Sequence, residues 1–315
     1  MAVSERQVFE AARAGAPPVT PPGKTLRILV TGGAGGIGSR LVEKLAAAGH
    51  KTRALILPAD PLKNRLAGIN CEIVEGDVAA ADTLAGALAG IDTVYHLAAV
   101  IVSTDPAAFG KINAAGTANV VKAATAAGAR HFIYVSSASV TYGKPTPYAK
   151  SKMAGEDAVR NAPGLPWTIV RPTLVYDREG GLEMEMFLNY LKKFPVVPFV
   201  GMGRARKRPV YAGDMIDGLA RIAGNERTYG KTYNFSGGET VTMLELARLL
   251  LEHEGLKRMI LPLPEVMWMA AAAVVGAFTG SAVLVRQGIR GFIEDADLDN
   301  AEALRDIGFN PVPAR

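Results

Sequence analysis

The stretch TGGAGGIG, Thr31–Gly38, decides the fold of this chain. It follows the apolar run LRILV (26–30) and precedes the helical pattern SRLVEKLAAAGH (39–50), so its glycines fall where a strand turns into a helix. Glycine at such a turn permits positive φ, brings the backbone close to a pyrophosphate and lets the helix approach the sheet, while the first N–H groups of the helix face the anion. The stretch therefore predicts a dinucleotide-binding turn rather than a mere tight turn.

The same alternation of short apolar runs and helical segments continues along the first half of the chain. The expected strands are LRILV (26–30), TRALIL (52–57), CEIVEG (71–76), TVYHLA (93–98), HFIYVSS (131–137) and WTIVRP (167–172). The strands read as continuous apolar runs, as they do in a parallel sheet that is covered on both faces. The pattern predicts an α/β fold with a Rossmann-type doubly wound parallel sheet and a smaller, interleaved C-terminal part.

Composition narrows the class of protein. The 315 residues are 49% hydrophobic and 21% charged, which is typical of a globular protein. The net charge of +5 is spread over the chain, and the basic cluster at 204–208 is too local for a nucleic-acid-binding stripe. A single cysteine, Cys71, excludes an intramolecular disulfide and a Cys/His zinc site, so we expect no metal and a reducing cytoplasm.

Two segments stand apart from this pattern. Residues 1–24 have no apolar core of the kind a signal peptide needs, and with PPVTPPG (17–23) they are interpreted as a tail and linker. Residues 266–285 carry no formal charge over twenty positions, about the length of a membrane span. Their Ala and Gly content favours a buried or surface-docked helix, and membrane contact stays open as the lesser alternative.

The motifs, taken in order, resemble those of the extended short-chain dehydrogenases/reductases, also called the NAD-dependent epimerase/dehydratase superfamily. TGGAGGIG matches the family's TGxxGxxG pattern. The resemblance continues through GDV (76–78), HLAA (96–99), INAAGTANVV (112–121), VSSAS (135–139), YAKSK (148–152) and RPTLVY (171–176). It implies an NAD(P) cofactor, a small-molecule substrate and a homodimer built on helices beside the active site.

The resemblance also implies which residues bind the cofactor. Asp77 and Val78 would contact the adenine, and Leu97 to Ala99 the ribose and nicotinamide side, with Asn113 supporting the site from its helix. The full set is Gly32, Gly35, Gly36, Ile37, Gly38, Asp77, Val78, Leu97, Ala98, Ala99, Asn113, Ser136, Tyr148, Lys152 and Pro172.

Tyr148 and Lys152 are the expected catalytic pair. Four residues apart, they share one face of a helix. A phenol has a pKa of about 10, but a nearby ammonium and a positively charged nicotinamide favour the phenolate, so Tyr148 could take or return a hydroxyl proton. Ser137 would bind the substrate oxygen that exchanges this proton with Tyr148. The resemblance also implies a hydrogen bond from Lys152 to the nicotinamide ribose. The expected reaction is hydride exchange at a secondary alcohol or ketone carbon.

The choice between NAD and NADP is less clear. Many NAD-preferring members carry an acidic residue at the end of the second strand, where this chain has Ile56 and Leu57. Asp60 could reach a ribose instead. Three basic residues could bind the 2′-phosphate of NADP: Arg53, Lys63 and Arg65. NAD is favoured slightly over NADP.

The second half departs from the family pattern. Only ten residues, ASVTYGKPTP, separate Ser137 from Tyr148, so a wall of the active site is missing or replaced. We expect a dinucleotide-binding domain over 25–176 and a mainly substrate-binding part over 177–315, with 209–236 returning to the sheet. Within that part, Thr242 and Glu245 have capping-box spacing, and Asp214 stands where a carboxylate caps a helix.

Three functions remain open from the sequence, and the first of them is favoured. The first is an oxidoreductase or epimerase of a nucleotide sugar, whose diphosphate would bind Arg204, Arg206 and Arg208. The second is an alcohol dehydrogenase or reductase of the hydroxysteroid or dihydroflavonol type. The third is a nucleotide-binding module without turnover. The first two differ in whether the arginines face the pocket.

Overall fold

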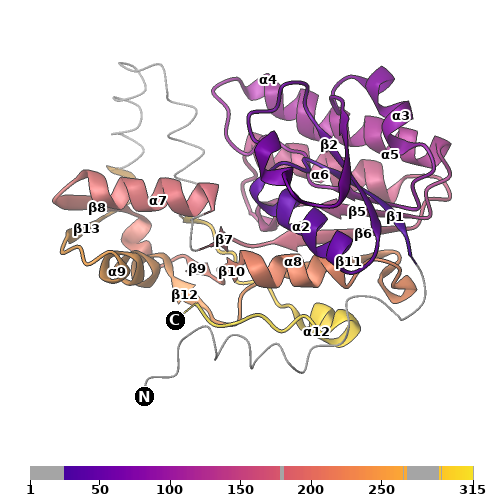
Figure 1. The fold of residues 1–315 in the computed structure, drawn as a ribbon. Helices are drawn as coiled ribbons and strands as arrows, with labels where there is room; N and C mark the ends of the chain where they lie inside the picture. The colour runs from indigo at the N-terminus through magenta and orange to yellow at the C-terminus, as the bar shows by residue number, and fades with distance from the viewer. Residues whose placement is uncertain (1–24, 178–180, 265, 268–290, 292, 315) are drawn as a thin grey trace.

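The computed structural model describes residues 25–177, 181–264, 266–267, 291 and 293–314 (Figure 1). The expected N-terminal tail (1–24) lies outside these residues, as does nearly all of the uncharged stretch 266–285. In the part that is described, no helix has both the length and the apolar character needed to cross a bilayer.

A seven-stranded parallel sheet forms the centre of the larger domain. Its order is β11-β6-β5-β4-β1-β2-β3. The strands are β1 Arg27–Thr31, β2 Lys51–Ile56, β3 Cys71–Glu75, β4 Thr93–His96, β5 His131–Val135, β6 Trp167–Pro172 and β11 Lys231–Phe235. From β1 the chain adds β2 and β3 on one side and then continues with β4 on the other side of β1, which is the topology of a doubly wound sheet. The predicted fold class is confirmed.

Helices cover both faces of this sheet. One face packs against α2 Gly36–Ala47, α8 Ala212–Ala220 and α12 Ala301–Ile307, and the other against α3 Leu84–Leu88, α5 Gly116–Ala126 and α6 Pro147–Arg160. Alternate residues of β1 explain the arrangement: Ile28 and Val30 enter the first core, and Leu29 enters the second. A short helix, α4 Pro106–Ala108, and a π-helical segment, η3 Phe109–Ala115, lead into α5. The short 3₁₀ segments are η1 Lys63–Leu66, η2 Ala81–Thr83, η4 Ala138–Thr141, η5 Gly201–Gly203 and η6 Glu226–Thr228.

A smaller lobe with its own core lies beside the carboxyl ends of the strands (Figure 1). It contains helices α7 Leu182–Lys193 and α9 Met243–His253 and strands β8 Val196–Val200 and β13 Met259–Leu263. Two further strand pairs join the lobe to the larger domain: β7 Val175–Tyr176 with β10 Val210–Tyr211, and β9 Arg206–Lys207 with β12 Val241–Thr242. Because β11 and α12 follow parts of this lobe in the chain yet pack on the central sheet, the two parts interleave.

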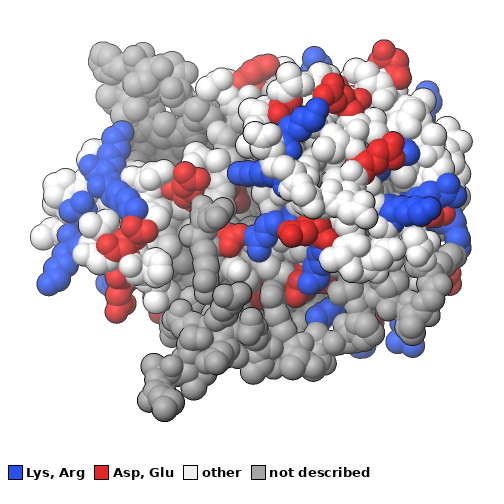
Figure 2. All heavy atoms as spheres, in the orientation of Figure 1, with Lys and Arg blue, Asp and Glu red and all other residues white. Residues whose placement is uncertain are grey.

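Charged side chains are mixed on the visible surface. Figure 2 shows basic and acidic side chains interspersed over the face of the larger domain. Within the described ranges, His, Cys, Asp and Glu form no group of three or more that could hold a metal ion.

Candidate active site and cofactor cleft

The glycine loop at the end of β1 is shaped by very close backbone contacts. Gly32 has a φ of +67°, and a Cβ on it would lie 3.0 Å from the amide nitrogen of Ala98. A Cβ on Gly38 would lie 2.1 Å from the carbonyl oxygen of Gly32. A side chain at either position would push the loop away from the sheet or from α2, so these two glycines are required by packing.

Gly36 leaves space at the start of α2, whereas a Cβ on Gly33 would lie 2.6 Å from the Ala54 Cβ and one on Gly35 would lie 3.2 Å from the Gly32 carbonyl oxygen. Gly35 is the N-cap residue, and the nearest atom to a Cβ on Gly36 would be the Nη1 of Arg65, 3.8 Å away. The first N–H groups of the helix therefore face an open cradle beside a guanidinium group. The helix N-terminus attracts an anion and fits the pyrophosphate of a dinucleotide, and the guanidinium offers a partner to a second anionic group. Ile37 follows within the first turn and packs against the core under α2.

A buried hydrogen-bond network supports the loop from below. The Thr31 hydroxyl accepts hydrogen bonds from the amides of Leu97 (3.2 Å) and Ala98 (3.1 Å) and bonds to His96 Nδ1 at 2.7 Å. The other ring nitrogen of His96 bonds to Thr117 at 3.0 Å. Burial lowers the pKa of His96 to about 3, so the ring is neutral. The HLAA motif pointed to Leu97–Ala99 and missed this histidine.

Asn113 ties the same segment to the catalytic helix. Its side chain accepts from the amide of Val100 (2.8 Å) and donates to the Val100 carbonyl (2.9 Å) and to the Ser151 hydroxyl (3.0 Å). Asn113 lies in the π-helical segment η3, where the backbone departs from regular α-helix. It thereby links the end of β4, past Ala99, to α6.

Asp77 and Val78 lie in the turn after β3. One carboxylate oxygen of Asp77 accepts the amide of Ala79 at 2.9 Å, which fixes the turn. Val78 is buried and packs against Gly116 at the start of α5, where a Cβ would lie 3.0 Å from the Val78 Cγ2. Both residues are positioned by local structure at the same sheet edge as the glycine loop.

The end of β2 offers few side chains that could hydrogen-bond the ribose hydroxyls of a cofactor. Ile56 is buried and Leu57 is exposed. Asp60 uses one carboxylate oxygen to accept the amide of Leu62 at 2.9 Å, so it stabilises its own turn.

The three candidate basic residues differ in their surroundings. Arg53 donates to Glu72 at 2.7 Å, and Lys63 lies 3.3 Å from Glu75. Arg65 instead lies against the glycine loop. Of the three, Arg65 has the placement closest to a cofactor phosphate.

Tyr148 stands in the first turn of α6, behind a cap formed by Thr146 and Pro147. Burial raises the pKa of the Tyr148 phenol, the carboxylate of Glu183 raises it further, and a hydrogen bond with Ser137 opposes them. The sequence predicts that Lys152 and a bound nicotinamide cation favour the phenolate, whereas in this structure burial and the Glu183 charge hold the pKa of the phenol above its ordinary value. The phenol is therefore protonated at neutral pH.

Lys152 lies one turn further along α6 and is almost completely buried, with 2% of its side chain exposed. Its Nζ donates to the Val135 carbonyl at 2.7 Å and lies 4.2 Å from the centre of the Tyr134 ring. Burial lowers the pKa of Lys152 to about 7, against the opposing effect of Glu156. The Lys152 side chain thus extends from α6 to the end of β5.

Glu156 organises the charges under this site, and sequence reasoning missed it. It accepts hydrogen bonds from Ser136 (2.6 Å), Arg160 (2.7 Å) and both arms of Arg171 (2.8 and 2.6 Å). The hydroxyl of Ser136 is therefore directed to Glu156, and Pro172 directly follows Arg171 at the end of β6. The spacing of four residues from Lys152 was the available signal.

The arginines at 204–208 lie on the side of β9 opposite to Lys207. Arg204 and Arg206 are exposed, and Arg206 pairs with Asp297 at 2.8 Å. Arg208 lies 3.9 Å from the same carboxylate. Lys207 is buried because successive residues of a strand point to opposite faces. Two of the three arginines therefore hold the C-terminal segment, and no diphosphate site is formed by all three.

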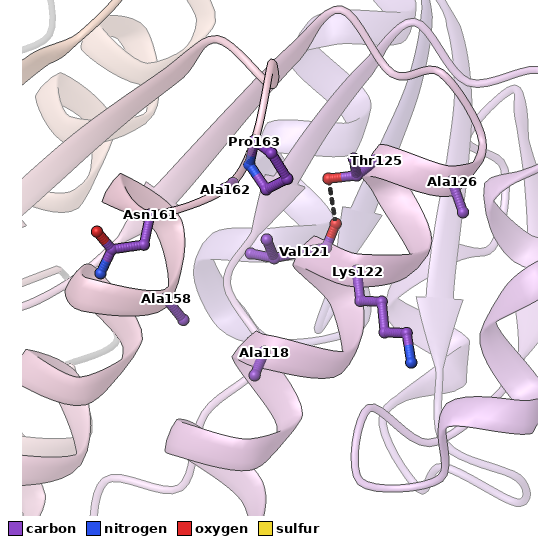
Figure 3. Close-up of a pocket in the computed structure, with 9 residues that line it drawn as sticks. All are labelled: Ala118, Val121, Lys122, Thr125, Ala126, Ala158, Asn161, Ala162 and Pro163. Carbon is purple, nitrogen blue, oxygen red and sulfur yellow. Dashed lines mark hydrogen bonds between the residues drawn. The ribbon is translucent and has the colours of Figure 1, made fainter.

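A separate hollow of about 350 Å³ lies between α5 and the C-terminal end of α6 (Figure 3). Its lining is mainly apolar, with Ala118 and Val121 from α5 and Ala158 and Ala162 from α6 and its end. Tyr148 stands at the opposite end of α6, so this hollow does not belong to the proposed reaction site.

Comparisons with known proteins agree on the class. A family model described as NAD(P)H-binding matches residues 32–187. The chain is 28% identical over 330 residues to a 3 beta-hydroxysteroid dehydrogenase/Delta 5-->4-isomerase of Mycobacterium tuberculosis, covering 91% of this chain and 86% of the relative. It is 31% identical over 254 residues to a UDP-glucose 4-epimerase of Mycolicibacterium smegmatis, covering 70% and 80%. A solved dTDP-glucose 4,6-dehydratase of Streptomyces venezuelae with NAD bound superposes with a TM-score of 0.72 at 25% identity, over 91% of this chain and 92% of the other.

Proposed function

Because this chain belongs to the extended short-chain dehydrogenase/reductase, or NAD-dependent epimerase/dehydratase, superfamily, we propose that it exchanges hydride at a secondary alcohol or ketone carbon, with Tyr148 as the acid or base. The observation that carries the proposal is the convergence of Tyr148, Ser137 and Lys152 at the edge of the sheet where the glycine loop opens.

The protein's own groups have distinct roles in this proposal. Bound NAD(P) supplies the nicotinamide that exchanges hydride with the substrate carbon. Tyr148, protonated at neutral pH because burial raises its pKa, donates its proton to a ketone oxygen and is left as the phenolate. In the reverse direction this phenolate takes the proton of the alcohol and becomes the phenol again. Ser137 holds that oxygen, and Lys152 supplies positive charge beneath the phenol.

For the substrate, we favour a hydroxysteroid-type secondary alcohol or ketone without a diphosphate. Arg206 and Arg208 are directed to Asp297, which leaves this cluster poorly suited to bind phosphate. The hydroxysteroid dehydrogenase relative also matches over 91% of the chain. The second candidate is a nucleotide sugar, which the 31% identity to a UDP-glucose 4-epimerase favours.

We also propose a cytoplasmic homodimer. The outer faces of α5 and α6 carry small residues, Ala118, Ala158 and Ala162, around the hollow of Figure 3, and small side chains allow helices of two copies to approach closely. The single cysteine, Cys71, is unpaired, in keeping with a reducing compartment.

The first test is the melting temperature with NAD⁺, NADH, NADP⁺ and NADPH added separately. A ligand present at about 100 times its Kd adds about 2.7 kcal/mol to the free energy of unfolding, so one cofactor pair should give a clear shift. Absorbance at 340 nm then measures turnover of a 3β-hydroxysteroid and of UDP-glucuronate or another UDP-sugar that can be oxidised. A cofactor shift without turnover of any alcohol or ketone would favour a nucleotide-binding module instead.

Tyr148→Phe is the decisive variant. We expect kcat to fall by about 100-fold or more, since general acid–base assistance is lost, while the cofactor-induced melting shift is retained. Tyr229→Phe is the matched control, because Tyr229 packs on His131 at the other end of the strands and should keep full turnover. Retained turnover in Tyr148→Phe would refute the mechanism.

A further inference from the structure

The ring of Tyr134 lies directly beside the ammonium of Lys152. Tyr134 is fully buried in β5, and the Lys152 Nζ lies over its ring, 4.2 Å from the centre. The same Nζ donates to the carbonyl of Val135, the next residue of the strand, at 2.7 Å. The face of an aromatic ring carries partial negative charge and attracts a cation, most strongly where water is excluded. Two consecutive residues of β5 therefore receive the ammonium, one through its side chain and one through its backbone.

Packing against two other elements fixes the position of this ring. The His96 ring of β4 stacks on it, with 5.7 Å between the ring centres and 20° between the planes. On α6, a Cβ on Gly155 would lie 2.2 Å from the Tyr134 hydroxyl oxygen, so the phenol fills the space that glycine leaves on the helix. Side chains packed this closely have little freedom to move. The ring is therefore a fixed surface for the ammonium.

The carboxylate that is nearest to Lys152 along α6 is shared among other partners. Glu156 accepts hydrogen bonds from Ser136, from Arg160 and from both arms of Arg171. Its charge offsets the burial of the Lys152 ammonium only in part. The ring face of Tyr134 supplies an attraction that this carboxylate does not.

The other titratable groups around Lys152 keep one charge state near neutral pH. Burial lowers the pKa of His96 on β4 to about 3, and burial raises the pKa of Tyr148 on α6. Burial acts to raise the pKa of Glu156, but hydrogen bonds, above all with Arg171 of β6, lower it overall. The pKa of Lys152 is about 7, so the lysine is the member of this group that changes charge between pH 5 and 9.5.

We propose that Tyr134 is a positioning residue for Lys152, and that the face of its ring keeps the ammonium charged and fixed beneath the Tyr148 phenol. This assignment rests on the proposed function, in which Lys152 supplies that charge. An aliphatic side chain would fill part of the same space in the core but would not attract the cation. The proposal therefore depends on the charge of the ring face rather than on its bulk.

A double-mutant cycle measures this attraction without turnover. Denaturant unfolding at pH 5 and at pH 9.5 compares wild type, Tyr134→Leu, Lys152→Met and the double variant, and the cycle is repeated with Tyr134→Phe, which keeps the ring. The cycle cancels what each substitution does separately. Phe132→Leu is the matched control, because Phe132 lies two residues earlier on the same face of β5, is equally buried and contacts the His96 ring at 6.0 Å.

At pH 5, Tyr134→Leu should lower the equilibrium constant of folding about tenfold more with Lys152 present than with methionine in its place, the scale of a desolvated cation–π contact. Because the ring raises the folded-state pKa of Lys152 relative to the Leu variant, this contribution is present at low pH and is lost as the pH rises through about 7. At pH 9.5 the difference should disappear. Tyr134→Phe and Phe132→Leu should show little difference at either pH. A difference that is equal at both pH values, or equally large for Phe132→Leu, would overturn the proposal.

A second pair of variants serves if Tyr134→Leu does not fold. Phenylalanine and pentafluorophenylalanine at position 134 have nearly the same shape, but fluorination reverses the charge of the ring face. The fluorinated ring should show the tenfold difference from Lys152 at pH 5 and the phenylalanine ring should not. Equal behaviour of the two rings would contradict the proposal.

Turnover gives a readout that a purely structural ring would not move. We expect kcat to fall as the pH rises through the Lys152 pKa of about 7. In Tyr134→Leu this fall should occur about one pH unit lower, which corresponds to the tenfold effect, and Tyr134→Phe should restore the wild-type profile. An unchanged midpoint in Tyr134→Leu would show that the ring only fills space. Absence of turnover in the unsubstituted enzyme would refute the proposed function instead, and the unfolding cycle would still test the contact.

Discussion

The surroundings of Lys152 disfavour its protonated, charged form. Its ammonium is removed from water and donates to the carbonyl of Val135, while the charge of Glu156 only partly offsets the cost of burial. The result is a pKa of about 7, well below the ordinary value of 10.5. A residue kept under such a cost near reacting groups is typical of a functional site.

Replacing Lys152 with Met should therefore stabilise the protein at low pH. The folded form releases the Lys152 proton near pH 7 and the unfolded form near pH 10.5, so the unfolded form binds more protons between these values and wild-type stability rises with pH there. We expect Lys152→Met to melt higher than wild type at pH 6, with the difference shrinking as pH approaches 10, and to lose turnover. Melting temperatures at each pH check this, and a difference that does not depend on pH would contradict it.

Arg65 is the residue that we expect to bind the 2′-phosphate of NADP. Its guanidinium lies beside Gly36, whereas Lys63 is near Glu75. Arg65→Ala should raise the Kd of NADPH about tenfold, the scale of a hydrogen bond to a charged group, and change that of NADH much less. Lys63→Ala is the control, with both cofactors expected to bind as before. Equal effects of Arg65→Ala on NADPH and NADH would show that the arginine does not read the phosphate.

The connection from β1 to α2 has a single workable geometry. The helix begins directly at the loop, and its buried residues, such as Leu41 and Leu45, hold it on the sheet. A Cβ on Gly32, Gly33 or Gly38 would lie within 3.0 Å of a neighbouring atom, whereas the nearest atom to a Cβ on Gly36 would be the Nη1 of Arg65 at 3.8 Å. We therefore expect the first three glycines to be required by packing and Gly36 to leave room for a ligand.

This division predicts different outcomes for two similar substitutions. Gly38→Ala would place a Cβ 2.1 Å from the Gly32 carbonyl oxygen, and the forced shift should lower the free energy of unfolding by about 2 kcal/mol. Gly36→Ala meets only Arg65 at 3.8 Å, so it should keep or slightly raise stability and weaken cofactor binding instead. Denaturant unfolding and cofactor titration of both variants separate the effects, and an equal loss of stability in the two would refute this account.

One helix start follows its local sequence, and another residue at a helix start also serves a distant part of the chain. The capping box of α9 forms as its spacing predicts, with Thr242 and Glu245 bonding reciprocally. Asp214, in the first turn of α8, accepts the amide of Val312 at 2.9 Å with one carboxylate oxygen and so holds the C-terminal segment from 98 residues away.

At the scale of the whole molecule, the C-terminal segment is held by a strand that lies far away in the sequence. Lys207 of β9 forms a bridge with Ala296 and donates to the carbonyls of Gly291 and Glu294. The ion pair between Arg206 and Asp297 strengthens the same junction.

The proposed dimer interface is formed by the outer faces of α5 and α6. Ala118→Glu would put a charge into the hollow between α5 and α6, so we expect it to shift the mass measured by light scattering from about twice the chain mass of 33.2 kDa toward the monomer. Ala301→Glu, on exposed α12, is the control and should leave the mass unchanged. A wild-type monomer, or a dimer unaffected by Ala118→Glu, would contradict this interface.

The sequence by itself determined the elements that are governed by neighbours along the chain. The glycine turn, the six strands predicted up to residue 172 and the Tyr148 and Lys152 pair on one helix face follow from local spacing, because apolar periodicity and glycine placement act over a few residues. The superfamily follows from the resemblance of the motifs in their order along the chain. The NAD(P)-binding class was confirmed with them.

Tertiary structure decided what depends on burial and on distant partners. It directed Ser136 to Glu156 and Arg206 to Asp297, raised the pKa of Tyr148, and buried Lys207 with its ammonium on the carbonyls of Gly291 and Glu294. No sequence spacing encodes these outcomes, because desolvation and long-range charge pairing exist only once the chain has folded.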